Sequence, residues 1–200
     1  MNLSLKCACQ KLQGTINDVS PSLNQRFVCY CDDCQAYAHY LDRVKQVLDV
    51  NGGTEIVPCH PASIHITQGE DNLACVRLSD DGMFRWYASC CKTPIANTPT
   101  NPKIAYAGVP STITDFSSLG PIVARNHGRY GHGTLPAGTS AGAPLRFVLR
   151  LLPFIFKGIF KKLHQHSPFF DASQKPKIEP VVLSDAEYYA LINLCSRSTP

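Results

Sequence analysis

The chain has 200 residues, a formal net charge of +4 and 44% hydrophobic residues. This length is typical of one domain with a core of its own. The composition excludes a disordered acidic tail, a collagen-like chain and a coiled coil, and no apolar run approaches the roughly 20 residues that cross a bilayer. The charge is small and concentrated late in the chain, which argues against nucleic-acid binding as the main function.

The first seven residues lack the apolar stretch of a secretory signal and the Arg-rich composition of a transit peptide. We therefore expect a cytoplasmic protein without a transmembrane segment. The chain contains ten cysteines, and disulfides are disfavoured in a reducing compartment. Clustered thiols in such a chain indicate metal binding or thiol chemistry.

The first half of the chain, up to residue 106, consists of short segments separated by turn residues, which predicts a mostly β module. Alternating apolar and polar residues predict strands at 63–67 and 74–78, and a strand at 83–87 follows the turn residues Asp81-Gly82. Residues 35–50 contain neither Pro nor Gly and have apolar residues near helical spacing, so a helix is expected to begin at or just after Cys34.

The second half differs in composition. Residues 107–143 are rich in Gly and Pro and are interpreted as a loop or linker. Residues 144–200 are expected to form a helical extension, with a helix at 145–163 that is kinked or split at Pro153 and a last short helix capped near Ser184. The basic apolar segment 145–163 has two interpretations: a surface helix for a membrane or partner, or a helix that packs on the β module or forms a homodimer contact. We favour the second.

Three groups of cysteines have spacings suited to metal binding. Adjacent residues in a strand point to opposite sides, whereas residues i and i+2 point to the same side. Cys29 and Cys31 therefore face one way, and the following turn returns Cys34 to them. The other two groups are Cys7-Ala8-Cys9 and the adjacent pair Cys90-Cys91. Because zinc binds four ligands tetrahedrally, seven thiols suffice for one closed site and one site with an open position.

The remaining candidates are weaker. We expect Cys59, Cys75 and Cys195 to be small buried hydrophobic residues. Asp32 and Asp33 are more typical of a helix N-terminus than of general bases. The glycine-rich surroundings of His127 and His132 favour a surface loop over a metal site.

The motif Cys29-Tyr30-Cys31-Asp32-Asp33-Cys34-Gln35, with the early Cys-x-Cys and the later Arg85-Trp86-Tyr87 and Cys91-Lys92-Thr93-Pro94, resembles the glutathione-dependent formaldehyde-activating enzyme family, also called the centromere protein V/GFA family. The similarity covers about residues 4 to 108. It implies a mostly β, Mss4-like zinc-binding fold for residues 1–106. It also implies structural zinc ligands at Cys7, Cys9 and Cys91, and a functional three-thiolate site at Cys29, Cys31 and Cys34 that handles glutathione or its hydroxymethyl adduct.

The sequence departs from the family pattern at three positions. Ala88 stands where the late motif has its first cysteine, and Lys92 and Gln10 stand where glycines follow the cysteines. Cys90 is the candidate substitute ligand; otherwise water, another side chain or no metal fills that position. The expected cofactor is therefore Zn²⁺, one or two ions, with glutathione as a co-substrate.

Two function classes follow. The first is a zinc-dependent carbon–sulfur lyase, or an enzyme of glutathione adducts, with a small thiol or thiol adduct as its partner. An anionic substrate would need a nearby cation, and the candidates are Arg43, Lys45, Arg77, Arg85 and Lys92. The second class is a non-catalytic zinc module that acts as a thiol carrier or interaction domain. Redox sensing through a strained Cys90-Cys91 disulfide ranks third.

Overall fold

The computed structural model describes residues 1–197 of the chain, and this part is mostly β. Its eleven strands form two sheets. The small sheet is antiparallel and has the order β1 (Leu3–Lys6), β2 (Gln13–Ile16), β5 (Ile64–Gln68). The large sheet has the order β10 (Ala124–Asn126), β3 (Phe27–Cys29), β4 (Thr54–Cys59), β9 (Ala107–Pro110), β8 (Thr93–Thr98), β7 (Phe84–Ala88), β6 (Leu73–Arg77), β11 (Val181–Val182).

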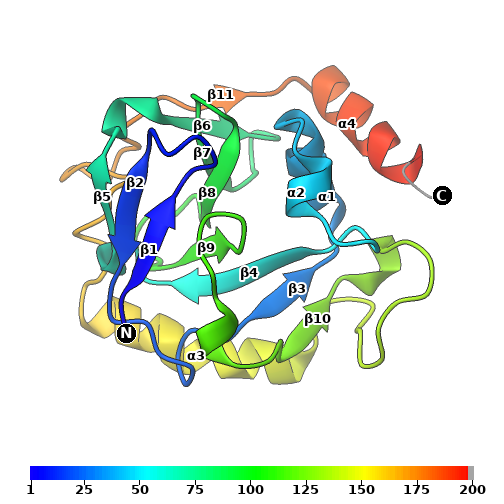
Figure 1. Cartoon of the computed structure of the whole chain (residues 1–200), viewed down its shortest axis with the longest axis horizontal. Coiled ribbons are helices and arrows are strands. Elements are labelled where there is room, and N and C mark those ends of the chain that lie inside the picture. Colours follow the sequence, from blue (N-terminus) through cyan, green and yellow to red (C-terminus); the bar gives the residue numbers. More distant parts are fainter. Residues whose placement is uncertain (198–200) are drawn as a thin grey trace.

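The helices lie around the sheets (Figure 1). They are α1 (Asp32–Tyr40), α2 (Val44–Val47), α3 (Leu145–Phe160) and α4 (Asp185–Arg197), with short 3₁₀ turns at Pro61–Ser63, Glu70–Asn72, Ser117–Leu119 and Gly128–Tyr130. Helix α3 runs along one edge of the molecule, and α4 lies beside α1. None of the helices within residues 1–197 is long and apolar enough to cross a membrane.

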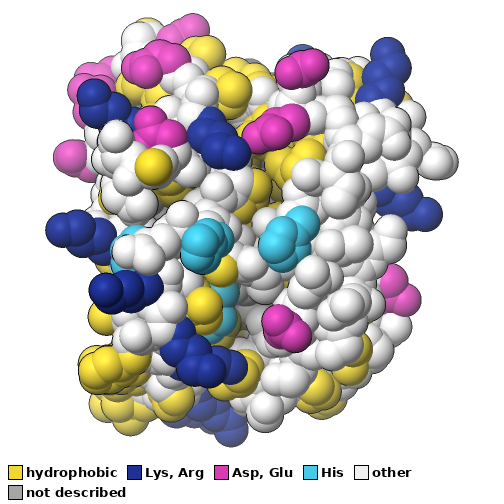
Figure 2. All heavy atoms as spheres, turned by 90° about the vertical axis from the view of Figure 1, so that its left-hand side faces the viewer, with side chains coloured by type: hydrophobic (Ala, Val, Ile, Leu, Met, Phe, Trp, Pro, Cys, Tyr) yellow, Lys and Arg dark blue, Asp and Glu magenta, His cyan; other side chains and the backbone are white. Residues whose placement is uncertain are grey.

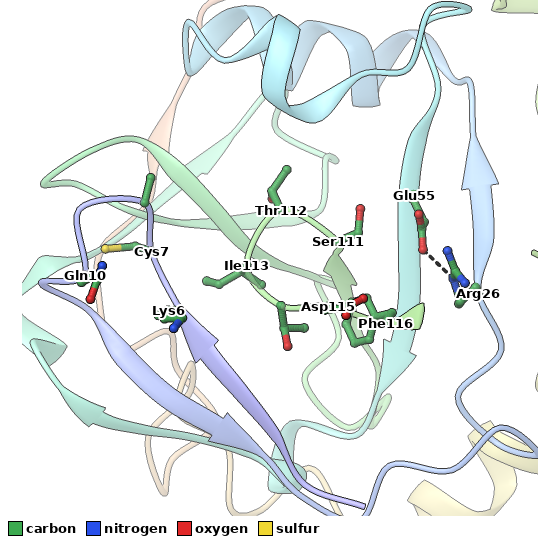
Figure 3. A pocket seen from close by; sticks show the side chains of 12 residues that line it. Lys6, Cys7, Gln10, Arg26, Glu55, Ser111, Thr112, Ile113, Asp115 and Phe116 are labelled. Carbon is green, nitrogen blue, oxygen red and sulfur yellow. Dashed lines mark hydrogen bonds and ion pairs between the residues drawn. The ribbon is translucent and has the colours of Figure 1, made fainter. Parts of the chain in front are cut away.

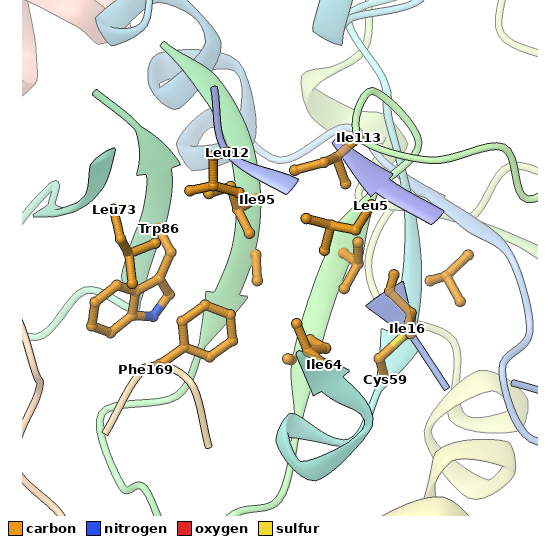
Figure 4. Close-up of a cluster of buried hydrophobic side chains, with 14 of the residues drawn as sticks. Leu5, Leu12, Ile16, Cys59, Ile64, Leu73, Trp86, Ile95, Ile113 and Phe169 are labelled. Carbon is orange, nitrogen blue, oxygen red and sulfur yellow. The ribbon is translucent and has the colours of Figure 1, made fainter. Parts of the chain in front are cut away.

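The main core lies between the small sheet and the large sheet (Figure 4). Leu5, Leu12 and Ile16 of the β1–β2 region meet buried residues of the large sheet. Trp86 is fully buried there and donates its Nε1 hydrogen to Thr98 Oγ1 at 2.9 Å. Phe169 stacks on Trp86 with ring centroids 5.0 Å apart, so the chain after α3 returns to complete this core.

Several sequence predictions agree with the structure. The expected strands appear as β5, β6 and β7, and β6 pairs with β7 as an antiparallel hairpin. The last helix begins after Ser184, whose backbone N–H and hydroxyl both donate to Glu187 Oε2, at 2.8 and 2.7 Å. The helix expected from Cys34 begins two residues earlier, at Asp32, and is divided at Asp42, which has a left-handed backbone (φ 53°).

Two segments differ from expectation. The Gly- and Pro-rich stretch 107–143 contains β9 and β10, and β9 lies between β4 and β8 inside the large sheet. These strands have four and three residues, so backbone pairing builds them without a side-chain pattern that periodicity could detect. Helix α3 continues through Pro153, whose missing N–H removes only one helical hydrogen bond.

Candidate metal centres

Four thiols meet where the two sheets approach each other. Cys7 and Cys9 lie on the turn between β1 and β2, and Cys90 and Cys91 lie on the turn between β7 and β8. The sulfur of Cys9 is 3.6 Å from that of Cys7 and 3.3 Å from that of Cys90, and the sulfurs of Cys90 and Cys91 are 3.9 Å apart. A tetrahedral zinc site with Zn–S near 2.3 Å has its sulfurs about 3.8 Å apart. The four-thiol cluster can therefore hold a metal ion such as zinc.

The conformation of the second turn explains how two adjacent cysteines face one point. The backbone N–H groups of Cys91 and Lys92 both donate to the carbonyl of Ala88, at 3.3 and 2.7 Å. Lys92 then adopts a left-handed backbone (φ 54°), as does Gln10 (φ 61°) after the first pair of cysteines. This tight turn brings the sulfur of Cys90 within 3.3 Å of that of Cys9 and 3.8 Å of that of Cys7.

The protein environment favours ionised sulfur at Cys91, whereas burial raises the pKa of Cys7 and raises that of Cys90 to about 12. Cys7 Sγ accepts the backbone N–H of Leu12 at 3.3 Å, and the Thr93 hydroxyl lies 3.1 Å from Cys91 Sγ. Burial raises the pKa of Cys91, but hydrogen bonds from Thr93 and Cys9 outweigh burial and lower this pKa to about 6. A thiolate is the form that binds zinc, so Cys91 is prepared for ligation at neutral pH.

Three further thiols converge at the junction of β3 and α1. Cys29 ends β3, Cys31 is the residue before the first turn of α1, and Cys34 lies in that turn. Their sulfurs lie within 4.8 Å of one another, and Cys29 and Cys34 are buried. The side chain of Cys31 makes no capping hydrogen bond to the helix, so its sulfur is not used by the local fold. This three-thiol cluster offers three of the four ligands that zinc takes.

Arg85 brings a buried positive charge to the three-thiol cluster. It projects from β7, is 3% exposed, and its Nη2 lies 3.2 Å from Asp33 Oδ2. Hydrogen bonds from Cys29 and Cys31, followed by the charge of Arg85, hold the pKa of Cys34 well below its usual range. Asp33 also accepts the Tyr188 hydroxyl of α4 at 2.9 Å, so α4 helps to fix this ion pair.

A small pocket lies beside Cys34 and Arg85. Thr54 of β4 and Asn97 of β8 also line it, and it has room for about one water molecule. Thr54 Oγ1 and Asn97 Oδ1 are buried and have no hydrogen-bond partner among the described residues. Buried polar atoms are normally paired, so these two are available to a ligand of the pocket. Thr54 and Asn97 could not be predicted from the sequence, because no motif or spacing distinguishes them from other strand residues.

The remaining cysteine and histidine candidates lie outside the two thiol clusters. Burial raises the pKa of Cys59 and Cys75 to about 12 and that of Cys195 to about 11, and all three lie in apolar clusters. His132 Nε2 lies 2.8 Å from Gln35 Oε1, outside both thiol clusters. Arg43 donates to the carbonyl of Cys91 at the four-thiol turn. Among the five candidate cations, only Arg85 lies against the three-thiol cluster in the described contacts.

Another pocket, of about 490 Å³, lies away from the three-thiol cluster (Figure 3). Cys7 and Gln10 stand at one end and the ion pair of Arg26 with Glu55, at 2.7 Å, stands at the other. Cys7 is the one clustered thiol among its lining residues. This pocket is open to solvent and shares no lining residue with the three-thiol cluster.

A family model matches residues 2–180. The chain belongs to DUF6151, a family of unknown function. None of the curated proteins matches the chain. Among solved structures, the crystal structure of a Rhodobacter sphaeroides protein from structural genomics is similar with a TM-score of 0.40 and 14% sequence identity, covering 61% of this chain and 97% of that chain.

Proposed function

We propose that this DUF6151 protein binds zinc at both thiol clusters and uses the three-thiol cluster for the chemistry of a small thiol. The observation that carries the proposal is the pocket beside Cys34, where a buried cation and two unpaired polar side chains adjoin an incomplete set of zinc ligands. The four-thiol cluster is complete with protein ligands alone and has a structural role. The reaction class is carbon–sulfur lyase, with glutathione or a similar thiol as co-substrate.

The expected chemistry follows from the ligand set. A bound zinc ion would lower the pKa of a thiol at the open position, so that a nucleophilic sulfur exists at neutral pH. In the addition direction the sulfur attacks an aldehyde carbon, a C–S bond forms, the C=O π bond breaks, and the oxygen takes up the proton that the thiol released. The lyase direction is the reverse. Three thiolates and Zn²⁺ would carry a formal charge of −1. The guanidinium of Arg85, which also pairs with Asp33, lies against this negative set. Asn97 and Thr54 offer hydrogen bonds to the reacting group.

The turn geometry supports a relationship to the glutathione-dependent formaldehyde-activating family. The sequence replaces two glycines of that family's pattern with Gln10 and Lys92, and both residues have the left-handed backbone that glycine favours. Cys90 compensates for the missing ligand at Ala88, because its sulfur lies 3.3 Å from that of Cys9 and 3.8 Å from that of Cys7. These three departures are therefore compatible with the proposed relationship.

The test compares metal content and thiol chemistry in matched variants. The native protein should hold two zinc ions per chain and accelerate the equilibration of formaldehyde with glutathione. The variant Cys29→Ser/Cys31→Ser/Cys34→Ser should hold one zinc, remain folded and lose the acceleration. The matched control replaces the three isolated cysteines, Cys59→Ala/Cys75→Ala/Cys195→Ala, and should keep two zinc ions. Native protein with two zinc ions and no effect on the reaction would rule out the enzymatic role.

A non-catalytic zinc module is the second candidate, and the size of the pocket favours it. Space for about one water molecule admits the tip of a substrate and leaves the rest outside. In that case zinc at the three-thiol cluster would bind a thiol without transforming it. Glutathione binding that depends on Cys29, Cys31 and Cys34, without any change in reaction rate, would identify this carrier role.

A further inference from the structure

Helix α3 has two apolar faces, and only one of them contacts the protein. Phe147, Phe154 and Gly158 are buried against the body of the molecule. The opposite face exposes a row of large hydrophobic residues at steps of three or four, which is the spacing of one helix face. Its members, with their exposed fractions, are Leu145 (72%), Leu149 (54%), Leu152 (39%), Phe156 (52%) and Phe160 (82%), flanked by Val148 and Ile159. We call these seven residues the α3 apolar face.

This exposure is concentrated on one helix. Of the 15 large hydrophobic residues that are exposed among the described residues, seven belong to the α3 apolar face. Single exposed hydrophobic side chains are normal on protein surfaces, whereas a contiguous patch marks an interaction site. In the space-filling view, hydrophobic and basic side chains gather along the lower edge of the molecule, the edge on which α3 lies in Figure 1 (Figure 2).

The charged residues of α3 and of the two positions after it are all positive. Arg146 and Arg150 lie in its first half, and Lys157, Lys161 and Lys162 lie in and just after its second half. The sequence contains no Asp or Glu between Asp115 and Asp171. None of these five cations forms an ion pair with a carboxylate among the described residues. Asp18 lines a pocket together with Lys157 and Lys161. The five cations outnumber this one carboxylate, so the surface along α3 is complementary to a negatively charged partner.

The positive charge of α3 favours an anionic membrane over a second copy of the chain as the partner. A second copy of the chain packed face to face would bring ten cations together with no acidic residue of the helix to offset them. A membrane with anionic headgroups offers both an apolar interior for Leu and Phe side chains and negative charge for the flanking Lys and Arg. The helix is too short and too basic to span a bilayer, in agreement with the absence of any spanning helix within residues 1–197.

We propose that the α3 apolar face docks the protein on anionic membrane surfaces, with the helix axis in the plane of the headgroups. The aromatic rings of Phe156 and Phe160 enter the boundary between headgroups and acyl chains. The Arg and Lys side chains extend from the sides of the helix to lipid phosphates and carboxylates. The buried face of α3 remains on the protein, so docking requires no unfolding of the core.

Vesicle co-sedimentation tests the proposal with the full chain. The native protein should sediment with vesicles of phosphatidylcholine and phosphatidylserine and remain in solution with phosphatidylcholine alone. Binding should weaken as salt is raised. The variant Arg146→Gln/Arg150→Gln/Lys161→Gln should lose about a hundredfold in affinity, since each cation near an anionic surface contributes severalfold. The matched control, Lys11→Gln/Lys45→Gln/Lys92→Gln, removes the same charge away from α3 and should bind nearly as the native protein does.

A second variant tests the apolar contribution. Phe156→Ser/Phe160→Ser should abolish sedimentation, while Tyr189→Ser, an equally exposed aromatic residue on α4, should not. Thermal melts confirm that each variant is folded. Equal binding to neutral and anionic vesicles, or equal loss in the two charge variants, would overturn the proposal. A native dimer that the Phe156→Ser/Phe160→Ser variant converts to monomer, without lipid binding by either, would assign the face to a second copy instead.

Discussion

The imidazole of His60 stacks on the ring of Phe154, with centroids 3.9 Å apart and ring planes 6° from parallel. His60 Nδ1 donates to the carbonyl of Ala105 at 2.9 Å, and its buried Nε2 has no hydrogen-bond partner within residues 1–197. Gly158 lets α3 approach closely, because a Cβ there would come within 3.0 Å of the His60 ring. This contact is a principal attachment of α3 to the protein.

The attachment predicts a dependence of stability on pH. Burial lowers the pKa of His60, partly opposed by the Ala105 hydrogen bond and reinforced by Lys157. The stability that neutral His60 contributes is therefore fully present above the unfolded-state pKa of about 6.5. It is lost as the pH falls through the lower folded-state pKa. Urea unfolding between pH 7.5 and 5 should show stability falling on acidification. His60→Phe should flatten this dependence, and His65→Gln, at an exposed histidine, should retain the native slope.

Metal removal should destabilise the protein chiefly through the four-thiol cluster. Chelation should lower the free energy of unfolding by at least about 4 kcal/mol relative to protein with free zinc at a thousand times the dissociation constant. Cys90→Ala should lose one zinc and most of this effect, whereas Cys75→Ala should keep both. An unchanged melting temperature in Cys90→Ala with full zinc content would show that Cys90 is not a ligand.

The left-handed backbone at Lys92 predicts a stabilising substitution. A non-glycine residue in this conformation costs about 1 kcal/mol, so Lys92→Gly should raise the free energy of unfolding by about 0.5–1 kcal/mol. Lys11→Gly, at an exposed lysine without a positive φ, should instead lower it. Denaturant melts of the zinc-loaded proteins measure both. Destabilisation by Lys92→Gly equal to that by Lys11→Gly would contradict the turn geometry.

Arg85 predicts a difference in thiol reactivity. Arg85→Met removes a buried charge that helps to lower the pKa of Cys34, so the thiol should ionise at higher pH. In metal-free protein, the reaction of Cys34 with a thiol reagent should slow at pH 7, and zinc should bind the three-thiol cluster more weakly. Arg77→Met is the matched control on the neighbouring strand, where Arg77 Nε donates to the carbonyl of Gly82. Equal reactivity of Cys34 in both variants would show that Arg85 does not act on it.

The sequence predicts those parts of the site that depend on residues close together in the chain, and not those that depend on distant strands. The three thiols at 29, 31 and 34 converge through strand and helix periodicity, which spacing alone reveals. The role of Arg85 and the unpaired Thr54 and Asn97 depends on pairing between distant strands, which no local pattern encodes. The same holds for β9, whose place inside the large sheet comes from its neighbours rather than from its Gly- and Pro-containing sequence.

The two thiol clusters also differ in when they can form during synthesis. The sulfurs of Cys29, Cys31 and Cys34 lie within six consecutive residues, so a ribosome presents them almost together. Cys9 and Cys90 are 81 positions apart, which at about 5–20 residues per second separates their emergence by roughly 4–16 s. During this interval Cys7 and Cys9 are exposed without their partners. Metal binding at the two clusters would therefore follow chain order, with the local cluster first.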